Sequence, residues 1–242
     1  LAIYYFNKLI LMYVKEKDAL WLTFIFAILP ARWLVVRSVG SPEPLFVGAI
    51  IASIYYFLNK KYALATFWGI VAQVTKSPGT LLFIAYLSVF ILEQFKKSSL
   101  IHLNKSLELF NLRSLITLLI PLSLLGVFTL YKYTFNDFFA YFNSGDNLHL
   151  LFPPFQIFNS SQTWVGTFWL EEVIFIYLFG LLGFLKLIKD NKLILASFVG
   201  IFFASTIFVS HRDLIRYSLP LVPFLFVAFS DFLAKKEFKI AM

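Results

Sequence analysis

Cationic side chains stand in three short segments that each separate two apolar stretches of this sequence. The segments are RSVGSPEPLF (37–46), TKSPGT (75–80) and SHRDLIRY (210–217). Arg presents a planar fork of donors that matches a phosphate group, and the Lys ammonium contacts phosphate as a point charge. Ionisable groups near membrane depth usually pair, line a cavity or bind a ligand. Together, the three segments therefore predict a site for a lipid phosphate or diphosphate.

The residues of these segments divide into two predicted roles. Those predicted to bind the phosphate are Lys76, His211, Arg212 and Arg216. Those predicted to support the site are Arg37, Ser41, Glu43, Asp213 and Tyr217. The sequence offers no HExxH motif and no close carboxylate–His spacing, so we predict no metal site. It also offers no phosphate-binding glycine loop and no serine nucleophile motif, and we expect no cofactor.

Simpler explanations stay open for the same charges. A cation near a helix end also reaches lipid headgroups by snorkelling, which explains Arg37, Lys76 or Arg216 taken singly. Glu43 has two interpretations: a structural ion pair with Arg37, which we favour, or a group that orients a substrate hydroxyl. Asp213 has the plainer alternative role of neutralising Arg212 or Arg216.

The composition predicts an integral membrane protein. Of 242 residues, 60% are hydrophobic and 14% are charged, whereas a soluble domain has about 45–50% apolar and about 25% charged residues. A water-soluble core of this size cannot hide so many apolar side chains. We therefore assign the net charge of +8 to loops at an anionic membrane face, with membrane lipid and not nucleic acid as partner.

Apolar stretches predict an all-α, polytopic transmembrane bundle that forms a single membrane domain over 1–242. About nine spans are expected, at 1–14, 19–36, 44–58, 62–75, 79–95, 115–133, 170–185, 193–209 and 217–234. A span needs about 20 apolar residues, so 44–58 and 62–75 either cross as short spans or form a re-entrant hairpin. Short spans are favoured, because a hairpin would bury Lys60 and Lys61 at about 2.5–3.5 kcal/mol each.

Loop charges predict the orientation, since cytoplasmic loops are rich in Lys and Arg. Alternating spans place 14 of the 21 basic residues on one side, which we take as cytoplasmic, with the C-terminus and an amphipathic linker at 96–114. The outer side receives short loops and one long aromatic loop at 134–169, which is either an interface belt or a lid for an amphipathic ligand. The three cationic segments also lie on this outer side.

Short motifs in the same segments resemble the GT-C superfamily of polytopic glycosyltransferases. They are most similar to the PIG-V-like mannosyltransferases and their bacterial relatives. Pro30 and Ala31 match the start of the family pattern, and "SPEPLF" (41–46) matches its S-x-E-x-L-F part, although Pro42 and Pro44 differ from the usual residues. "TKSPG" (75–79) matches T-R-x-x-G with Lys in place of Arg, and "RYSLPLVP" (216–223) matches R-Y-x-L-P-x-x-P.

The resemblance implies transfer of a sugar, such as mannose, from a polyprenyl-phosphate donor to an acceptor on the extracytoplasmic side. The mechanism would be inverting: a carboxylate deprotonates the acceptor hydroxyl, which attacks the anomeric carbon while the lipid phosphate leaves. The family's catalytic acid lies in the first outer loop. Because the sequence starts at Leu1 within an apolar stretch, we expect a fragment whose catalytic acid lies upstream. A bacterial plasma membrane with the active face outside is the expected location.

Two other classes of function stay open. A flippase for lipid-linked saccharides, or another polytopic transporter, would also need an outer cationic pocket. A structural membrane subunit would carry no chemistry and would leave the clustered charges without a role. Helix breakers such as Gly40, Pro42 and Pro78 stand at span ends and not at mid-membrane, which favours the enzyme. Neither the sugar, the acceptor, the chain length of the donor nor the oligomeric state follows from the sequence.

Overall fold

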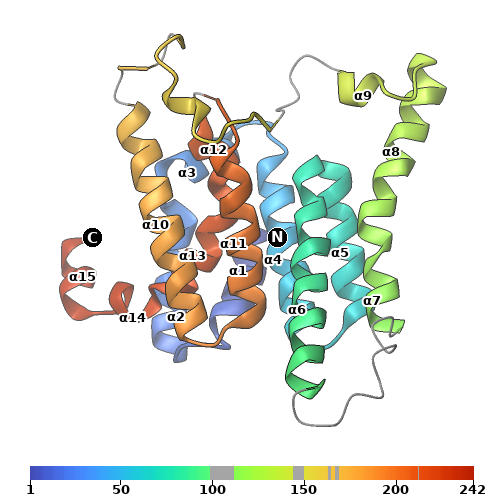
Figure 1. Ribbon diagram of the computed structural model, residues 1–242. Coiled ribbons are helices and arrows are strands. Elements are labelled where there is room, and N and C mark those ends of the chain that lie inside the picture. Colours follow the sequence, from blue (N-terminus) through green and yellow to red (C-terminus); the bar gives the residue numbers. More distant parts are fainter. Residues whose placement is uncertain (99–111, 144–149, 163–164, 167–168, 212) are drawn as a thin grey trace.

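The computed structural model describes residues 1–98, 112–143, 150–162, 165–166, 169–211 and 213–242. Within these ranges every regular element is a helix, as the sequence predicts (Figure 1). The first half comprises α1 (Ala2–Ile10), α2 (Glu16–Ile28), α3 (Ala31–Ser38), α4 (Glu43–Leu58), α5 (Tyr62–Thr75), the 3-10 turn η1 (Ser77–Gly79) and α6 (Thr80–Ser98). The second half comprises α7 (Leu112–Thr117), α8 (Leu119–Phe135), α9 (Ala140–Asn143), η2 (Gln156–Phe158), α10 (Trp169–Lys189), α11 (Leu193–Ile207), α12 (Leu214–Ser218), η3 (Leu219–Leu221), α13 (Val222–Ala228), α14 (Ser230–Leu233) and α15 (Lys236–Ala241).

Two of the described helical segments are long and apolar enough to cross a membrane. They cover Ser77–Phe95 and Leu115–Phe135. Only 28% and 11% of their apolar windows are buried inside the protein, so most of these side chains face outward, as they would toward lipid. A third candidate is the pair α2 and α3, which bends by 66° at its break. The chain thus has features of an integral membrane protein.

The expected nine spans are not supported, and the reason is helix length. At about 1.5 Å per residue, the 14 to 16 residues of α4, α5 and α11 reach about 21–24 Å, short of the about 30 Å hydrocarbon core. Prolines divide two other stretches, because Pro lacks the donor that a helix interior needs. Pro30 separates α2 from α3, and Pro220 and Pro223 accompany the break of 217–234 into α12, η3, α13 and α14.

Helix α4 lies at the centre of the bundle. Eleven of its sixteen residues are buried, which matches a helix that is apolar on every side. It packs against α1 and α5, while α11 packs against α6 and α10. Gly48 permits the close approach of α1, because a Cβ there would lie 3.0 Å from the backbone nitrogen of Ala2. Packing around α4 therefore fixes the position of its first residue, Glu43.

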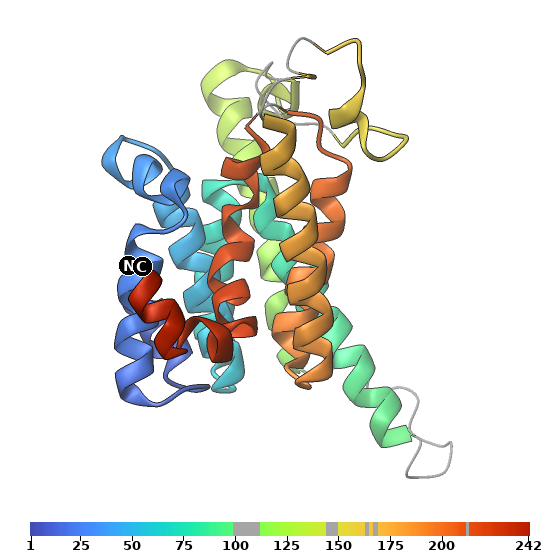
Figure 2. The same ribbon diagram turned by 90° about the vertical axis from the view of Figure 1, so that its left-hand side faces the viewer.

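The two ends of the bundle carry different elements of the chain. Its upper end, as drawn in Figure 1, carries α3, the start of α4, η1, α9 and α12. The lower end carries the turns α1–α2, α4–α5 and α10–α11, and α6 projects past the other helices there (Figures 1 and 2). The three cationic segments thus meet at the upper end. Most of the predicted 96–114 linker (99–111) lies outside the described residues, as do 144–149, 163–164 and 167–168 of the aromatic loop.

Candidate functional site: an ion cluster around Glu43

Three segments far apart in the sequence converge on one carboxylate. Glu43 is 2% exposed, and its Oε1 accepts from Lys76 Nζ at 2.5 Å and from Arg216 Nε at 2.7 Å. Its other oxygen, Oε2, accepts a hydrogen bond from the Ser41 hydroxyl. We name these four residues the Glu43 cluster. The cluster holds two cations against one carboxylate, so its net charge is positive.

The local sequence explains why Glu43 begins a helix. Pro42 is the N-cap residue of α4 and Pro44 lies in its first turn, where proline is tolerated because the first helical N–H groups have no partner in the helix. A carboxylate in the first turn also interacts favourably with the helix dipole. Glu43 is consequently anchored by its backbone and by its three side-chain donors.

Lys76 is positioned by a tight turn at the end of α5. The backbone N–H of Lys76 donates to Ala72 O at 2.9 Å, and η1 then folds back onto α5. A Cβ at Gly79 would lie 2.5 Å from the backbone of Gln73, so only glycine allows this approach. Thr80 adds a hydrogen bond of 2.6 Å to the Gln73 side chain. The turn therefore directs Lys76 toward α4.

Arg216 is positioned by a small apolar cluster under α12. Leu214 is fully buried and packs with Ile157 of η2 and Val173 of α10. Residues 151–155 of the aromatic loop are fixed at the end of α11 by hydrogen bonds from Leu151 N to Phe208 O (2.8 Å) and from Phe155 N to Ile207 O (2.9 Å). Residues 150–158 of the predicted aromatic loop thus lie beside the segment that carries Arg216.

A second ion pair lies next to the cluster. Arg32 of α3 contacts Asp213, with 2.9 Å between Arg32 Nε and Asp213 Oδ1. The backbone N–H of Asp213 donates to His211 Nδ1 at 2.9 Å, so a neutral His211 carries its proton on Nε2. The Tyr217 ring contacts a residue of each set. Its centroid is 5.1 Å from the ring of His211, which is bonded to Asp213, and 5.2 Å from Nζ of Lys76, which belongs to the Glu43 cluster.

One of the predicted pairings is wrong, and another gains a partner that was not predicted. Glu43 does not pair with Arg37, because Arg37 is satisfied locally: it donates to the Ala27 carbonyl and lies 5.8 Å from the Trp33 ring centroid. Asp213 forms an ion pair with Arg32, and its charge also acts on Arg216. The predicted pairing of Asp213 with Arg212 lies outside the described residues. Arg37 therefore stands apart from the cluster that it was expected to support.

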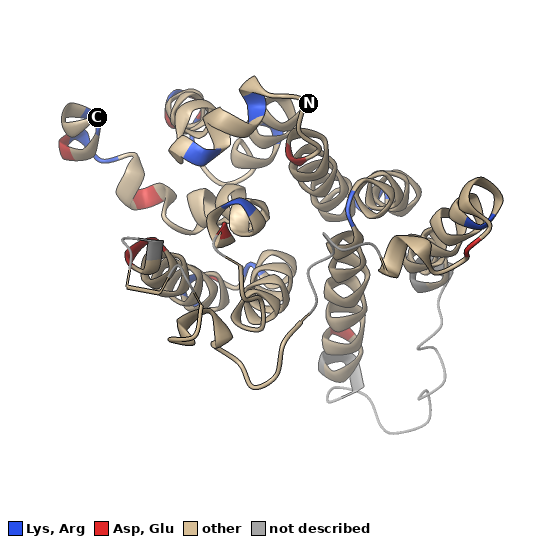
Figure 3. Ribbon diagram, turned by 90° about the horizontal axis from the view of Figure 1, so that it is seen from above, with Lys and Arg blue, Asp and Glu red and all other residues tan. Residues whose placement is uncertain are grey.

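The other predicted site residues lie at this end of the bundle. Lys76, Arg216, Ser41 and Glu43 meet directly, and Asp213, His211 and Tyr217 surround them through the contacts above. Arg212 lies outside the described residues. Figure 3, a view onto the upper end, shows the charged positions spread over several helices. The sequence interpretation omitted Arg32, although its place directly after the matched Pro30-Ala31 was a usable signal.

The two neighbouring cations favour the ionised form of Glu43. Burial by itself would raise the pKa of this carboxyl. The hydrogen bonds from Arg216 and Lys76 outweigh burial and lower the pKa of Glu43 below its ordinary value. The same hydrogen bond from Arg216 to Glu43 raises the pKa of Arg216. The carboxylate is thus a poor proton acceptor and acts as an anchor for two cations.

Both cations keep exposed surface beyond this anchor. The side chains of Lys76 and Arg216 are 20% and 36% exposed, against 2% for Glu43. A guanidinium has five donors and an ammonium has three, so one bond each to Glu43 does not exhaust them. The arrangement can therefore bind an anion with two held cations, and phosphate matches their geometry.

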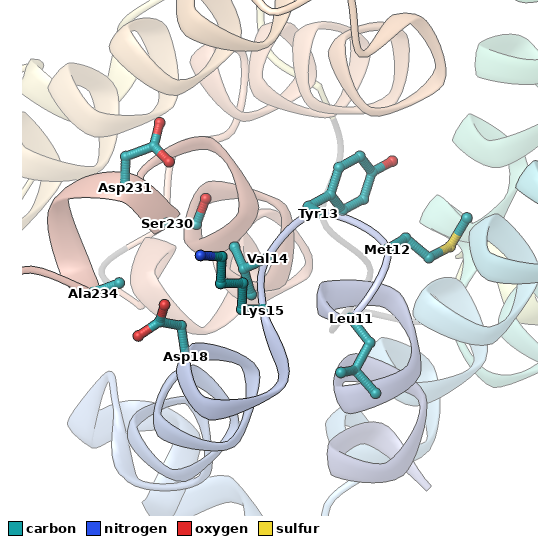
Figure 4. A pocket seen from close by; sticks show the side chains of 9 residues that line it. All are labelled: Leu11, Met12, Tyr13, Val14, Lys15, Asp18, Ser230, Asp231 and Ala234. Carbon is teal, nitrogen blue, oxygen red and sulfur yellow. The ribbon is translucent and has the colours of Figure 1, made fainter.

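A hollow of about 460 Å³ lies at the opposite end of the bundle (Figure 4). Loop 11–15, Asp18 of α2 and residues around α14 line it, and Lys15 points between the carboxylates of Asp18 and Asp231. Asp18 already binds Lys239 at 2.7 Å. This mixture of charges is separate from the Glu43 cluster and contributes nothing to it.

No family model, curated protein or solved structure matches this chain. The resemblance to GT-C enzymes therefore rests on the short motifs around Pro30, Glu43, Lys76 and Arg216. Three of these residues belong to one ion cluster. The family assignment stays a prediction.

Proposed function

We propose that this protein is a membrane glycosyltransferase of GT-C type. It would transfer a sugar from a polyprenyl-phosphate donor to an acceptor, by inversion, at the upper end of the bundle. One observation supports this proposal most: Glu43 holds Lys76 and Arg216 on a single carboxylate oxygen, with part of each cation exposed. The three residues also belong to the motifs that carry the resemblance to this family.

The chemistry assigned to the cluster is stabilisation of the leaving phosphate. When the acceptor oxygen forms its bond to the anomeric carbon, the bond to the lipid phosphate breaks and negative charge grows on the phosphate oxygens. Donors that are already held in place stabilise this charge without reorganisation. Lys76 and Arg216 have this role in the proposal, with His211 and Arg212 as further contacts. The base that accepts the hydroxyl proton is not assigned to a described residue.

We further propose that the upper end faces the outside of a bacterial plasma membrane, with the C-terminus in the cytoplasm. The lower end carries the lysine-rich turns, including Lys15, Lys60, Lys61 and Lys192. Positively charged loops favour the cytoplasmic side. The exposed aromatic residues of the loop at the end of α11, such as Phe152 and Phe155, would lie along the polyprenyl chain.

A flippase or transporter remains the alternative from another class. It would use the same two cations to bind a lipid diphosphate without cleaving it. A transfer assay separates the two functions, because only the enzyme releases free polyprenyl phosphate and forms a glycosylated acceptor.

The experiment is a transfer assay on purified protein, with polyprenyl-phosphate mannose as the first donor and other hexoses next. Arg216→Ala should abolish transfer while the protein remains expressed and folded. Lys132→Ala is the matched control, because Lys132 is an exposed cation on α8 that donates to Asn136 O and lies outside the cluster. Wild-type turnover by Arg216→Ala would refute a role for this cation, and donor binding without turnover by the wild type would favour the transporter.

A further inference from the structure

A cationic cavity lies at the lower end of the bundle, where α1 meets the α4–α5 turn. Its volume is about 180 Å³. Lys8 and Lys61 line it together with Asn59 and four tyrosines, which are Tyr4, Tyr5, Tyr55 and Tyr56. We name it the tyrosine–lysine pocket. No part of the proposed transfer reaction uses it.

The tyrosines form one connected wall around Tyr5. The Tyr5 ring centroid lies 5.2 Å from Tyr4, 6.1 Å from Tyr55 and 5.8 Å from Tyr56. The Tyr5 and Tyr56 hydroxyls are 3.2 Å apart. Such hydroxyls both donate and accept, so this wall offers donors to an anion in addition to the two ammonium groups.

The pocket carries positive charge without a balancing carboxylate. None of its lining residues is acidic. Among the described residues, no Asp or Glu lies within ion-pair distance of Lys8 or Lys61. Lys8 instead lies 5.7 Å from the Tyr4 ring centroid. The chemistry of the pocket therefore suits a singly or doubly charged anion.

Exposed apolar side chains continue from the pocket along the bundle. Tyr5 contacts Trp68 at 5.6 Å between centroids, and Trp68 contacts Phe67 at 5.4 Å. Phe67 is 54% exposed, and Tyr4 is 59% exposed. A polar, cationic hollow with an apolar surface beside it fits a molecule that has an anionic head and an acyl chain. Free phosphate would use only the hollow.

We infer that the tyrosine–lysine pocket binds the phosphate headgroup of an anionic phospholipid. Lys8 and Lys61 supply the charge, the tyrosine hydroxyls supply neutral hydrogen bonds, and the apolar surface at Phe67 contacts the acyl chain. The pocket is independent of the Glu43 cluster, because the two lie at opposite ends of the bundle.

Native mass spectrometry of the full chain in nonionic detergent tests this inference. The probes are phosphatidylglycerol, phosphatidylcholine and glycerol 3-phosphate. Phosphatidylglycerol should be retained about tenfold more tightly than phosphatidylcholine, and glycerol 3-phosphate at the same concentration should not displace it. The variant Lys8→Gln/Lys61→Gln should lose about tenfold or more in affinity for phosphatidylglycerol, because each lysine contributes a charge-assisted contact.

Lys60→Gln is the matched control, since Lys60 is the exposed neighbour of Lys61 and does not line the pocket. It should bind phosphatidylglycerol like the wild type, and Lys8→Arg/Lys61→Arg should retain most of the affinity. If the double Gln variant unfolds, the affinity of the single Lys61→Gln variant for phosphatidylglycerol tests the inference in its place. Equal retention of the two lipids, equal losses in the Lys60 and Lys61 variants, or displacement by glycerol 3-phosphate would overturn the inference. The last result would assign the pocket to free phosphate.

Discussion

Arg216 Nε lies 2.7 Å from Glu43 Oε1, although 173 residues separate them in the sequence. Lys76 shares the same oxygen from a distance of 33 residues. The buried carboxylate thus ties α12 and the α5–η1 turn to the start of α4. It also holds the positive charges of Lys76 and Arg216 close together, and these charges would repel each other if Glu43 did not balance them. The stability of this end of the bundle should depend on the charge of Glu43.

Replacement of Glu43 by Gln should lower the free energy of unfolding by about 1–3 kcal/mol. The neutral amide keeps the size of the side chain but no longer balances Lys76 and Arg216. Thermal unfolding of the purified protein in detergent measures the change. Glu93→Gln is the control, because Glu93 is exposed on α6 and its neutralisation should cost less than about 0.5 kcal/mol. Equal effects of the two variants would contradict the structural role of Glu43.

The same carboxylate predicts how stability changes with pH. The pKa of Glu43 is lowered from its ordinary value of 4.5, so its contribution is fully present above pH 4.5 and is lost as pH falls through the lower, folded-state pKa. The difference in melting temperature between the wild type and Glu43→Gln should therefore stay constant at neutral pH and narrow on acidification below 4.5. A difference that grows in acid would show that Glu43 is stabilised in its protonated form.

Two glycines should respond oppositely to replacement by Ala. Gly79→Ala should destabilise the protein by about 1–3 kcal/mol, because its Cβ would meet the backbone of Gln73 and push Lys76 away from Glu43. Gly126→Ala, on α8, has open space within 4 Å and should be neutral or stabilising by up to about 1 kcal/mol, since Gly weakens a helix. Unfolding and transfer assays of both variants check this. A harmless Gly79→Ala would contradict the tight turn.

Cysteine labelling should report which ends face which side of the membrane. The chain has no natural Cys, so single substitutions can be labelled without background. Ser160→Cys, in the aromatic loop, should react with a membrane-impermeant maleimide on intact cells. Asn59→Cys, in the α4–α5 turn, should react only after the cells are opened. Both positions are exposed. Labelling of both in intact cells would refute the proposed orientation.

Sequence patterns predicted the helical class and the gathering of the cationic segments, but not the partners within the cluster. Pro and Gly turns between apolar stretches depend on neighbouring residues alone, so the sequence predicted the starts of α4 and α6 to within one residue. The partner of Glu43 is a long-range property, because Arg216 reaches it only through the packing of α12 on η2 and α10. Arg37, nearer in sequence, finds the Ala27 carbonyl instead.

The predicted number of membrane spans was wrong for a related reason. Hydropathy counts apolar residues and does not weigh the effect of Pro30, Pro220 or Pro223 on a helix. The broken stretches 19–36 and 217–234 still bury part of their side chains in the bundle, such as Phe26 and Trp33 in the first and Phe224 in the second. Tertiary packing thus accommodates apolar stretches whose helices are bent or broken.

During synthesis, the two ion pairs of the Glu43 cluster can form only in one order. Glu43 and Lys76 leave the ribosome long before Arg216, so the early chain can form only the first of the two ion pairs. Closure of the 173-residue separation must wait until α10 to α12 have been made, at an added cost in loop entropy. A chain that stops before Arg216 therefore leaves its central carboxylate with half of its cations. The cluster forms in full only on a chain that extends at least to α12.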